Sequence, residues 1–166
     1  MHPAEDALAR GVPRDVGALP GAAPRPAETW LRIVQVHDRI TRRVDSALHR
    51  QHGLSLTGFE ALRRIAEAPG ERASMGEVAE AIGLSRAGVT STVNRLVAEG
   101  LVLRERGDGD RRLLHARLTS TGRERVAAAA RTHDDLVAHL LVLLGTDAGA
   151  VTDALARVSA AALPRP

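Results

Sequence analysis

Cysteine is absent from the sequence. Disulfides, thiolate metal sites, cysteine nucleophiles and thiol-based redox sensors are therefore excluded. Aromatic residues are nearly absent as well, because the chain has no tyrosine and otherwise carries only Trp30 and Phe59. Proteins that stack single-stranded bases need exposed rings, so the sequence argues against that class of nucleic-acid binding.

Long hydrophobic runs are also missing. No uninterrupted apolar run reaches the roughly 18 residues of a membrane helix, and the N-terminus lacks the basic and then apolar order of a signal peptide. We therefore expect a soluble, cytoplasmic protein with no membrane partner. Nothing in the sequence calls for a cofactor.

Lysine is absent, so every basic side chain is arginine, and the formal net charge is +3. Arginine forks match the geometry of phosphate, which favours a phosphate-rich partner. Exclusive use of arginine can equally reflect the base composition of a genome. The charge is therefore a hint about the partner and no more.

The 166 residues, of which 44% are hydrophobic, suit one domain with a core. Residues 1–27 contain five prolines and show no sustained hydrophobic period, so we expect a disordered N-terminal tail. Residues 28–166 then form a single domain.

Local signals predict the first helices. Residues 28–51 carry apolar side chains at three- and four-residue steps, the pattern of an amphipathic helix, and Gly53 suits its end. Thr57 and Glu60 match a capping box, in which a hydroxyl and a carboxylate each accept a hydrogen bond from the other residue's backbone N–H. A second helix is therefore expected to begin at Thr57.

A second capping box lies at Ser74 and Glu77. Gly83 ends the helix that this box opens, and Ser85 is placed to cap the next one. Two helices joined by a short turn with glycine form the helix-turn-helix pattern.

Two short runs follow, LVLRER (residues 101–106) and LLHARL (residues 113–118). Leu101 and Leu103 alternate with polar neighbours in the first run, as do Leu114, Ala116 and Leu118 in the second, so both are predicted to be strands. The glycines of RGDGDRR between them permit a tight reversal. A helix-turn-helix followed by such a hairpin predicts a winged helix.

Two helices complete the chain. Thr119 is expected to cap a long helix that runs to about Leu144, and Gly145 breaks it. Val151, with apolar residues at helical spacing after it, marks a final helix.

The winged helix predicts binding to double-stranded DNA, with the second helix of the motif in the major groove and the wing in the adjacent minor groove. Arg86 and Arg95 are expected to anchor phosphates. Asp110 is expected to orient a neighbouring guanidinium, and an arginine of the wing favours the narrow minor groove of A·T tracts. The candidate DNA-binding residues are Ser85, Arg86, Gly88, Thr90, Ser91, Asn94, Arg95, Asp110, Arg111 and Arg112.

The sequences of two segments resemble the MarR family of bacterial transcription regulators. DRRLLHARLTSTGRERV (residues 110–126) is similar to the family's wing and the start of its next helix. LSRAGVTSTVNRLVAEGLVLRE (residues 84–105) is similar to its recognition helix and first wing strand. The resemblance covers about residues 28–163. The chain departs from the family at Asn94, where Asp is common, and at Val97, where Glu is common.

The resemblance implies a mainly α fold with a small β-hairpin wing. A winged helix-turn-helix lobe, at about residues 57–118, would sit on a helical dimerisation domain of about residues 28–52 and 119–163. It further implies a homodimer on a pseudo-palindromic site, and a repressor controlled by a small effector, often anionic and aromatic or lipophilic. Trp30, His37 and Arg63 are candidate effector contacts, but one sequence does not assign the pocket.

The sequence leaves three alternatives open. One is a winged helix that serves only protein contacts, which strong dimerisation without salt-sensitive duplex binding would indicate. His49 and His52 have the spacing of a helical metal pair, but no third ligand is fixed. Ser85, His37 and Asp38 supply the residue types of a hydrolase without a scaffold that brings them together, so an enzyme is the remotest alternative.

Overall fold

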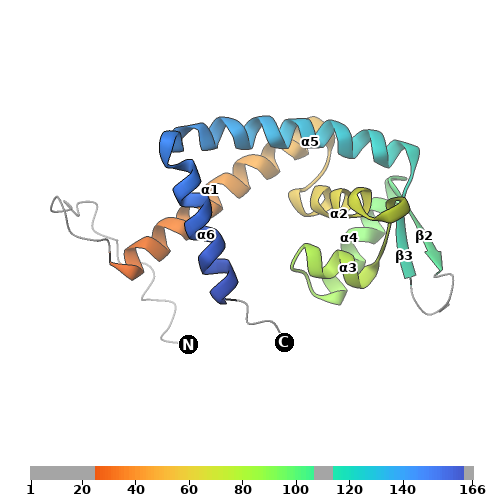
Figure 1. The fold of residues 1–166 in the computed structure, drawn as a ribbon. Helices are drawn as coiled ribbons and strands as arrows, with labels where there is room; N and C mark the ends of the chain where they lie inside the picture. Colours follow the sequence, from red (N-terminus) through yellow and green to blue (C-terminus); the bar gives the residue numbers. More distant parts are fainter. Residues whose placement is uncertain (1–24, 107–113, 163–166) are drawn as a thin grey trace, which may run out of the picture. The chain divides into compact units, whose positions relative to one another are not determined.

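The computed structural model describes residues 25–106 and 114–162 (Figure 1). The chain divides into two compact units, Met1–Gln35 and Val36–Pro166. The described part of the first unit is the beginning of one helix. The elements, in order, are α1 Pro26–His52, α2 Leu56–Glu67, a 3₁₀ turn η1 Pro69–Glu71, β1 Arg72–Ser74, α3 Met75–Ala81, α4 Arg86–Ala98, β2 Val102–Arg106, β3 Leu114–Leu118, α5 Ser120–Leu141, a 3₁₀ segment η2 Val142–Asp147, and α6 Ala148–Ala162.

Hydroxyl caps begin the helices of the lobe. Ser74 and Glu77 form the predicted capping box, and the hydrogen bond that the Ser74 N–H donates lowers the pKa of the Glu77 carboxyl. Ser85 caps α4 and Thr119 caps α5, as predicted. These predictions are confirmed because each capping hydrogen bond joins residues that are only three positions apart in the sequence.

The predicted start of α2 at Thr57 is wrong. The cap is Ser55, whose Oγ accepts a hydrogen bond from the Gly58 N–H at 3.1 Å, so Thr57 already lies inside the helix. The box pattern favoured Thr57 because Glu60 follows it by three residues. The second cap comes from outside the local pattern, because the Asp45 carboxylate of α1 accepts a hydrogen bond from the Leu56 N–H at 2.7 Å.

The core lies between α2, α4, the sheet and the adjoining parts of α1 and α5. Phe59 and Leu62 of α2 and Val93 and Leu96 of α4 are among the side chains that are fully buried. Figure 1 shows α2, α3, α4 and the strands gathered in one lobe, with the first turns of α5 leaving the end of β3. Side chains of α1 and α5, such as Leu48 and Val126, complete the core of this lobe.

The sheet has three strands in the order β1-β3-β2, all antiparallel. The sequence predicted β2 and β3 but missed β1, because three residues are too few to show a period. Leu103 and Leu114, two of the apolar residues in the alternating pattern, are 46% and 42% exposed. Leu103 pairs with Arg117 on the outer face, while Val102 pairs with Leu118 on the buried face.

The predicted long helix ends earlier than Leu144. α5 stops at Leu141, and Gly145, with φ 53° and ψ −129°, interrupts the 3₁₀ segment that follows. By length and composition alone, the helical stretch Ser120–Ala161 is apolar enough to cross a membrane, which the sequence had not led us to expect. The break at Gly145 lies within it, and Val126 at its start is packed in the lobe's core. The apolar surface beyond α5 is uncovered in the single chain.

Candidate nucleic-acid interface

Helix α4 has one buried and one exposed side. Val89, Thr92, Val93 and Leu96 are buried against the lobe. The five polar residues that the sequence assigned to the outer face are all exposed, namely Arg86, Thr90, Ser91, Asn94 and Arg95. The helix thus presents a continuous polar surface from a fixed position.

The start of α4 is held by its cap. The Oγ of Ser85 accepts a hydrogen bond from the Gly88 N–H at 3.2 Å. The hydroxyl of Thr90 donates to the carbonyl of Arg86 at 2.8 Å, one turn back along the helix. Because that donation uses the only hydroxyl proton, the Thr90 oxygen can only accept a further hydrogen bond, as from an amino group on a base edge.

Arg95 contacts a different helix. Its terminal nitrogen donates to the Oγ of Ser55 at 2.8 Å, so the same hydroxyl that caps α2 also holds this guanidinium. Within the described residues, no carboxylate lies within ion-pair distance of Arg95. The cation is thereby oriented without being neutralised. Val97, where the sequence departs from the family, packs against the core instead of contacting Arg95.

The wing arginines lie outside the described residues. Asp110, Arg111 and Arg112 belong to the segment 107–113, which connects β2 to β3. The described strands bring its two ends together, since Arg106 and Leu114 are paired in the ladder.

A cluster at the root of the wing escaped the sequence reasoning. Glu105 accepts a hydrogen bond from Arg117 Nε at 2.6 Å, and its other oxygen lies 3.7 Å from Arg72 Nε. Arg72 also donates to the carbonyl oxygen of Arg106 at 2.9 Å. The only sequence signal for this ion-pair cluster was that Glu105 is the single acidic residue of LVLRER.

A second ion pair joins the start of the sheet to α5. Arg123 donates to both carboxylate oxygens of Glu71, with distances of 2.6 to 2.9 Å. This hydrogen bonding holds the pKa of Glu71 below its ordinary value of 4.5. Glu71 also has a positive φ of 53°, so the pair secures a turn that is strained for a residue with a Cβ.

The close approach of α5 to the end of α4 depends on a glycine. A Cβ at Gly122 would stand 2.0 Å from the carbonyl oxygen of Leu101. That carbonyl accepts from the Thr119 N–H at 3.1 Å, and the Thr119 hydroxyl donates to the Gly100 carbonyl at 2.8 Å. These contacts join α5 directly to the segment that follows α4.

The histidine pair does not face a common point. His52 Nε2 lies 2.8 Å from the Thr132 hydroxyl of α5, while His49 is exposed. Thr132 donates to the side-chain oxygen of Gln51, so the His52 nitrogen must be the donor in their contact. Across residues 25–106 and 114–162, no three potential ligands among His, Asp and Glu gather at one place.

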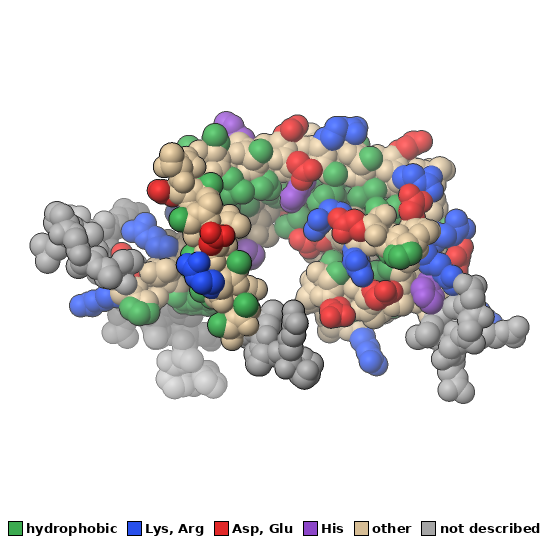
Figure 2. Space-filling model, in the orientation of Figure 1, with side chains coloured by type: hydrophobic (Ala, Val, Ile, Leu, Met, Phe, Trp, Pro, Cys, Tyr) green, Lys and Arg blue, Asp and Glu red, His purple; other side chains and the backbone are tan. Residues whose placement is uncertain are grey.

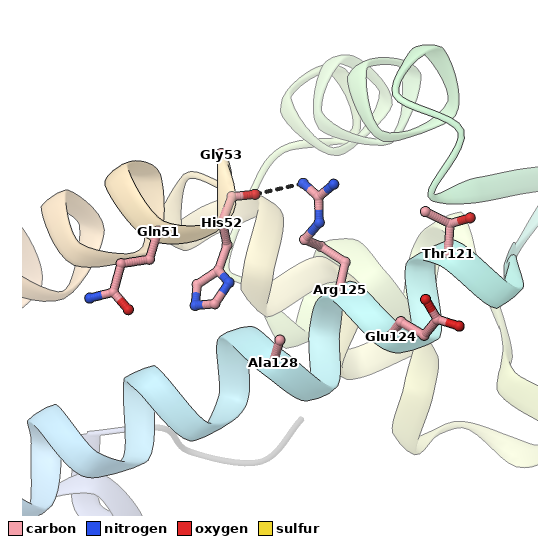
Figure 3. A pocket seen from close by; sticks show the side chains of 7 residues that line it. All are labelled: Gln51, His52, Gly53, Thr121, Glu124, Arg125 and Ala128. Carbon is pink, nitrogen blue, oxygen red and sulfur yellow. Dashed lines mark hydrogen bonds between the residues drawn. The ribbon is translucent and has the colours of Figure 1, made fainter.

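An open pocket of about 570 Å³ lies between the end of α1 and the first half of α5. Figure 3 shows the Arg125 side chain reaching from α5 to the carbonyl oxygen of His52, a hydrogen bond of 2.6 Å. None of the three residues considered as effector contacts lines it: Trp30 and His37 are exposed, and Arg63 pairs with Glu67. The pocket lining is Gln51, His52, Gly53, Thr121, Glu124, Arg125 and Ala128.

Comparisons with known proteins agree with this geometry. The sequence model of the MarR family matches residues 52–113. No curated protein sequence matches the chain significantly. The crystal structure of AbsC, a MarR family transcriptional regulator from Streptomyces coelicolor, has 27% sequence identity and a TM-score of 0.74, covering 83% of this chain and 95% of that one.

Two further regulators from Streptomyces coelicolor are similar. Sco3205, crystallised in complex with DNA, has 25% identity and a TM-score of 0.77, covering 87% of this chain and 92% of its own. Sco5413 has 26% identity and a TM-score of 0.73, covering 84% and 96%. The members of this family are transcription regulators and not enzymes. The matched segment and the folds of these relatives together show that the winged helix-turn-helix lobe of this chain is similar to that of MarR family transcriptional regulators.

Proposed function

We propose that the protein is a sequence-specific regulator of transcription that acts in the cytoplasm as a homodimer on a pseudo-palindromic site in double-stranded DNA. One observation carries the proposal: α4 exposes five polar side chains while its opposite side is fixed in the core. Each α4 would enter the major groove of one half-site, with the two centres about one helical turn apart. The relative Sco3205, crystallised with DNA, supports this choice of partner.

The exposed residues have distinct roles in this proposal. Arg86 and Arg95 contact phosphates, and Ser85 with Gly88 holds the start of the helix. The base edges are read by Thr90, Ser91 and Asn94, with Thr90 as an acceptor. Asp110, Arg111 and Arg112 carry the contact of the wing.

The wing assignment has its own test. Arg112→Ala should weaken binding to all sequences and reduce the salt slope by about one phosphate contact. A change of preference at one base pair in the major groove, without a change of slope, would refute the assignment.

The exposed apolar side chains support homodimerisation. Leu143 is 84% exposed, and apolar side chains are visible along α6 in the space-filling view (Figure 2). Consecutive exposed apolar side chains, such as Leu141, Val142 and Leu143, typically mark an interface between proteins. Covering it with a second copy would stabilise the pair by about 25 cal/mol for each Å² removed from water. The exposed apolar residues of α1, α5, η2 and α6 are Trp30, Leu31, Ile33, Val34, Val36, Leu141, Val142, Leu143, Leu155 and Val158.

We place the effector site in the 570 Å³ pocket. The Arg125 guanidinium offers donors to an anionic group beside its hydrogen bond to the His52 carbonyl, and Ala128 offers apolar surface. An effector that binds better when the two α4 helices are wrongly spaced for DNA would release the repressor by shifting the population. Arg125→Ala should abolish release by the effector while leaving DNA binding within about twofold of the wild type.

Fluorescence anisotropy tests the proposed function. The full chain would be titrated onto its own upstream intergenic DNA and onto scrambled duplex at two salt concentrations. We expect tight, salt-dependent binding and a clear preference for the native fragment. Equal weak binding to both would contradict sequence-specific regulation. Strong dimerisation with no salt-sensitive binding would instead favour a winged helix used for protein contacts.

A further inference from the structure

The hydroxyl of Ser55 serves two helices at once. Its Oγ accepts a hydrogen bond from the Gly58 N–H at 3.1 Å, which caps α2, and a second from a terminal nitrogen of Arg95 in α4 at 2.8 Å. These two donors occupy both lone pairs of the oxygen. A Cβ at Gly58 would lie 3.2 Å from this Oγ and 3.8 Å from the Arg95 nitrogen, so the three groups are closely packed. The guanidinium of Arg95 is thereby tied to the start of a helix that lies 40 residues earlier in the chain.

Ser55 is itself fixed from both sides. Leu54, the residue before it, is 1% exposed and belongs to the core, and its N–H donates to the Leu48 carbonyl of α1 at 3.4 Å. The N–H of Leu56, the residue after it, donates to the Asp45 carboxylate of α1 at 2.7 Å. Because both neighbours are anchored, the Ser55 oxygen has a set position beside α4.

The contact with Ser55 orients Arg95 and leaves its charge available. A guanidinium has five N–H donors, of which this hydrogen bond uses one. Arg95 is exposed, and among the described residues no carboxylate lies within ion-pair distance of it. A carboxylate in the place of Ser55 would orient the guanidinium as well but would cancel its charge, whereas a hydroxyl is neutral. An arginine that is ordered before it binds also loses less conformational entropy when it meets a phosphate.

We propose that Ser55 is a positioning residue for DNA binding, whose hydroxyl orders the Arg95 guanidinium in advance for a phosphate of the duplex backbone. The inference rests on the proposed function, in which Arg95 contacts phosphate. Ser55 acts only through Arg95. Since phosphate contacts carry no sequence information, Ser55 sets the general affinity for duplex DNA and not the choice of sequence.

Two variants separate the positioning of Arg95 from the capping of α2. Ser55→Gly removes the hydroxyl but leaves a residue that is well accepted at a helix N-cap, so α2 is hardly destabilised. We expect it to weaken binding to native and to scrambled duplex by about fivefold each, with the preference between them unchanged. The slope of affinity against salt should fall by less than the roughly one phosphate contact that Arg95→Gln removes. Ser55→Thr keeps the hydroxyl and should bind both duplexes within about twofold of the wild type.

The control is Thr57→Ala in the same turn of α2. It removes a hydroxyl that does not cap the helix, while the Arg95 contact to Ser55 remains. Both duplexes should therefore bind as they do to the wild type. The Arg95→Gln background supplies a second control. There Ser55→Gly should change affinity by less than about twofold, because the group through which Ser55 acts is gone.

Anisotropy titrations of these full-length variants over a series of salt concentrations, with thermal unfolding measured in parallel, test the inference. Wild-type affinity in Ser55→Gly or in Arg95→Gln would overturn it, as would a fivefold loss in Ser55→Gly that persists in the Arg95→Gln background. A loss confined to the native duplex would overturn it as well, and so would a Ser55→Thr variant as weak as Ser55→Gly.

The wild type separates this inference from the proposed function. Equal binding of the wild type to native and scrambled duplex would refute sequence-specific regulation alone, because the positioning of Arg95 is still measured on either duplex. A wild type that binds neither duplex would refute both.

Discussion

The winged lobe and the terminal helices of this chain differ in how they are stabilised. In the lobe, four hydroxyl caps, a buried core and long-range ion pairs fix every described element. In α6, by contrast, no described side chain is buried, and the apolar residues face outward. The difference teaches that the lobe, with the adjoining turns of α1 and α5, is stabilised by contacts within the chain, whereas α6 has apolar surface that suits a second copy.

The largest expected difference between the two regions concerns their aromatic side chains. Phe59 in α2 is 1% exposed and packs beside the His133 ring, whereas Trp30 in α1 is 64% exposed. Phe59→Ala should lower the free energy of unfolding by about 3–5 kcal/mol, the usual cost of truncating a buried aromatic side chain. Trp30→Ala should leave the lobe folded and raise the dimer dissociation constant.

Chemical denaturation of both variants, with sedimentation analysis of the dimer, would measure these effects. A large loss of lobe stability in Trp30→Ala at concentrations where the chain is monomeric would break the distinction between the two regions.

Glycine substitutions test where α5 is held. Gly122→Ala would place a Cβ 2.0 Å from the Leu101 carbonyl and should cost about 3 kcal/mol, because the backbone has to move. Gly149→Ala in α6 meets nothing within 4 Å and should stabilise the helix by about 0.5–1 kcal/mol. Urea unfolding of the pair measures both. Equal effects would mean that α5 is not clamped to the lobe.

The capping positions of α2 predict a smaller effect. Ser55→Ala removes both the cap and the acceptor of Arg95, and should cost about 1 kcal/mol. Thr57→Ala should change the free energy of unfolding by no more than a few tenths of a kcal/mol, since its hydroxyl does not cap the helix. A larger loss of stability in Thr57→Ala than in Ser55→Ala would instead support the capping box that the sequence predicted.

The smallest effect concerns pH. The folded pKa of Glu71 is lowered by the hydrogen bond from Arg123, so this carboxylate stabilises the fold above its unfolded pKa near 4.5. The contribution is lost as pH falls through the lower, folded value. Glu71→Gln should therefore lower Tm slightly at neutral pH, leave it unchanged below the folded pKa, and so flatten the dependence of Tm on pH in the acid range. An unaltered acid profile would show that the pair does not hold the turn.

The sequence predicted the winged helix correctly because its signals are local. Ser74, Gly83 and Ser85 mark the turns and caps of the helix-turn-helix within a dozen residues. Alternation predicted the first wing strand but did not give its phase, since Leu103 is 46% exposed. Here Leu101 belongs to the turn that follows α4, and both it and Val102 are buried.

Long-range partners were beyond the reach of sequence patterns. Ser55 and Arg95 are 40 residues apart, and Glu71 and Arg123 are 52 apart. No periodicity links such pairs, because the fold alone brings them together. The same holds for Arg72, which lies on a strand too short to be recognised and donates to the carbonyl of Arg106, 34 residues further along the chain.

Footprinting of the upstream intergenic DNA with the full chain tests the central claim most directly. A lobe that reads DNA and terminal helices that pair two lobes predict two protected segments whose centres are about one helical turn, or about 10 base pairs, apart. Arg86→Ala should weaken protection of both segments equally. A single protected half-site, or no protection of the native fragment beyond that of scrambled duplex, would contradict the account.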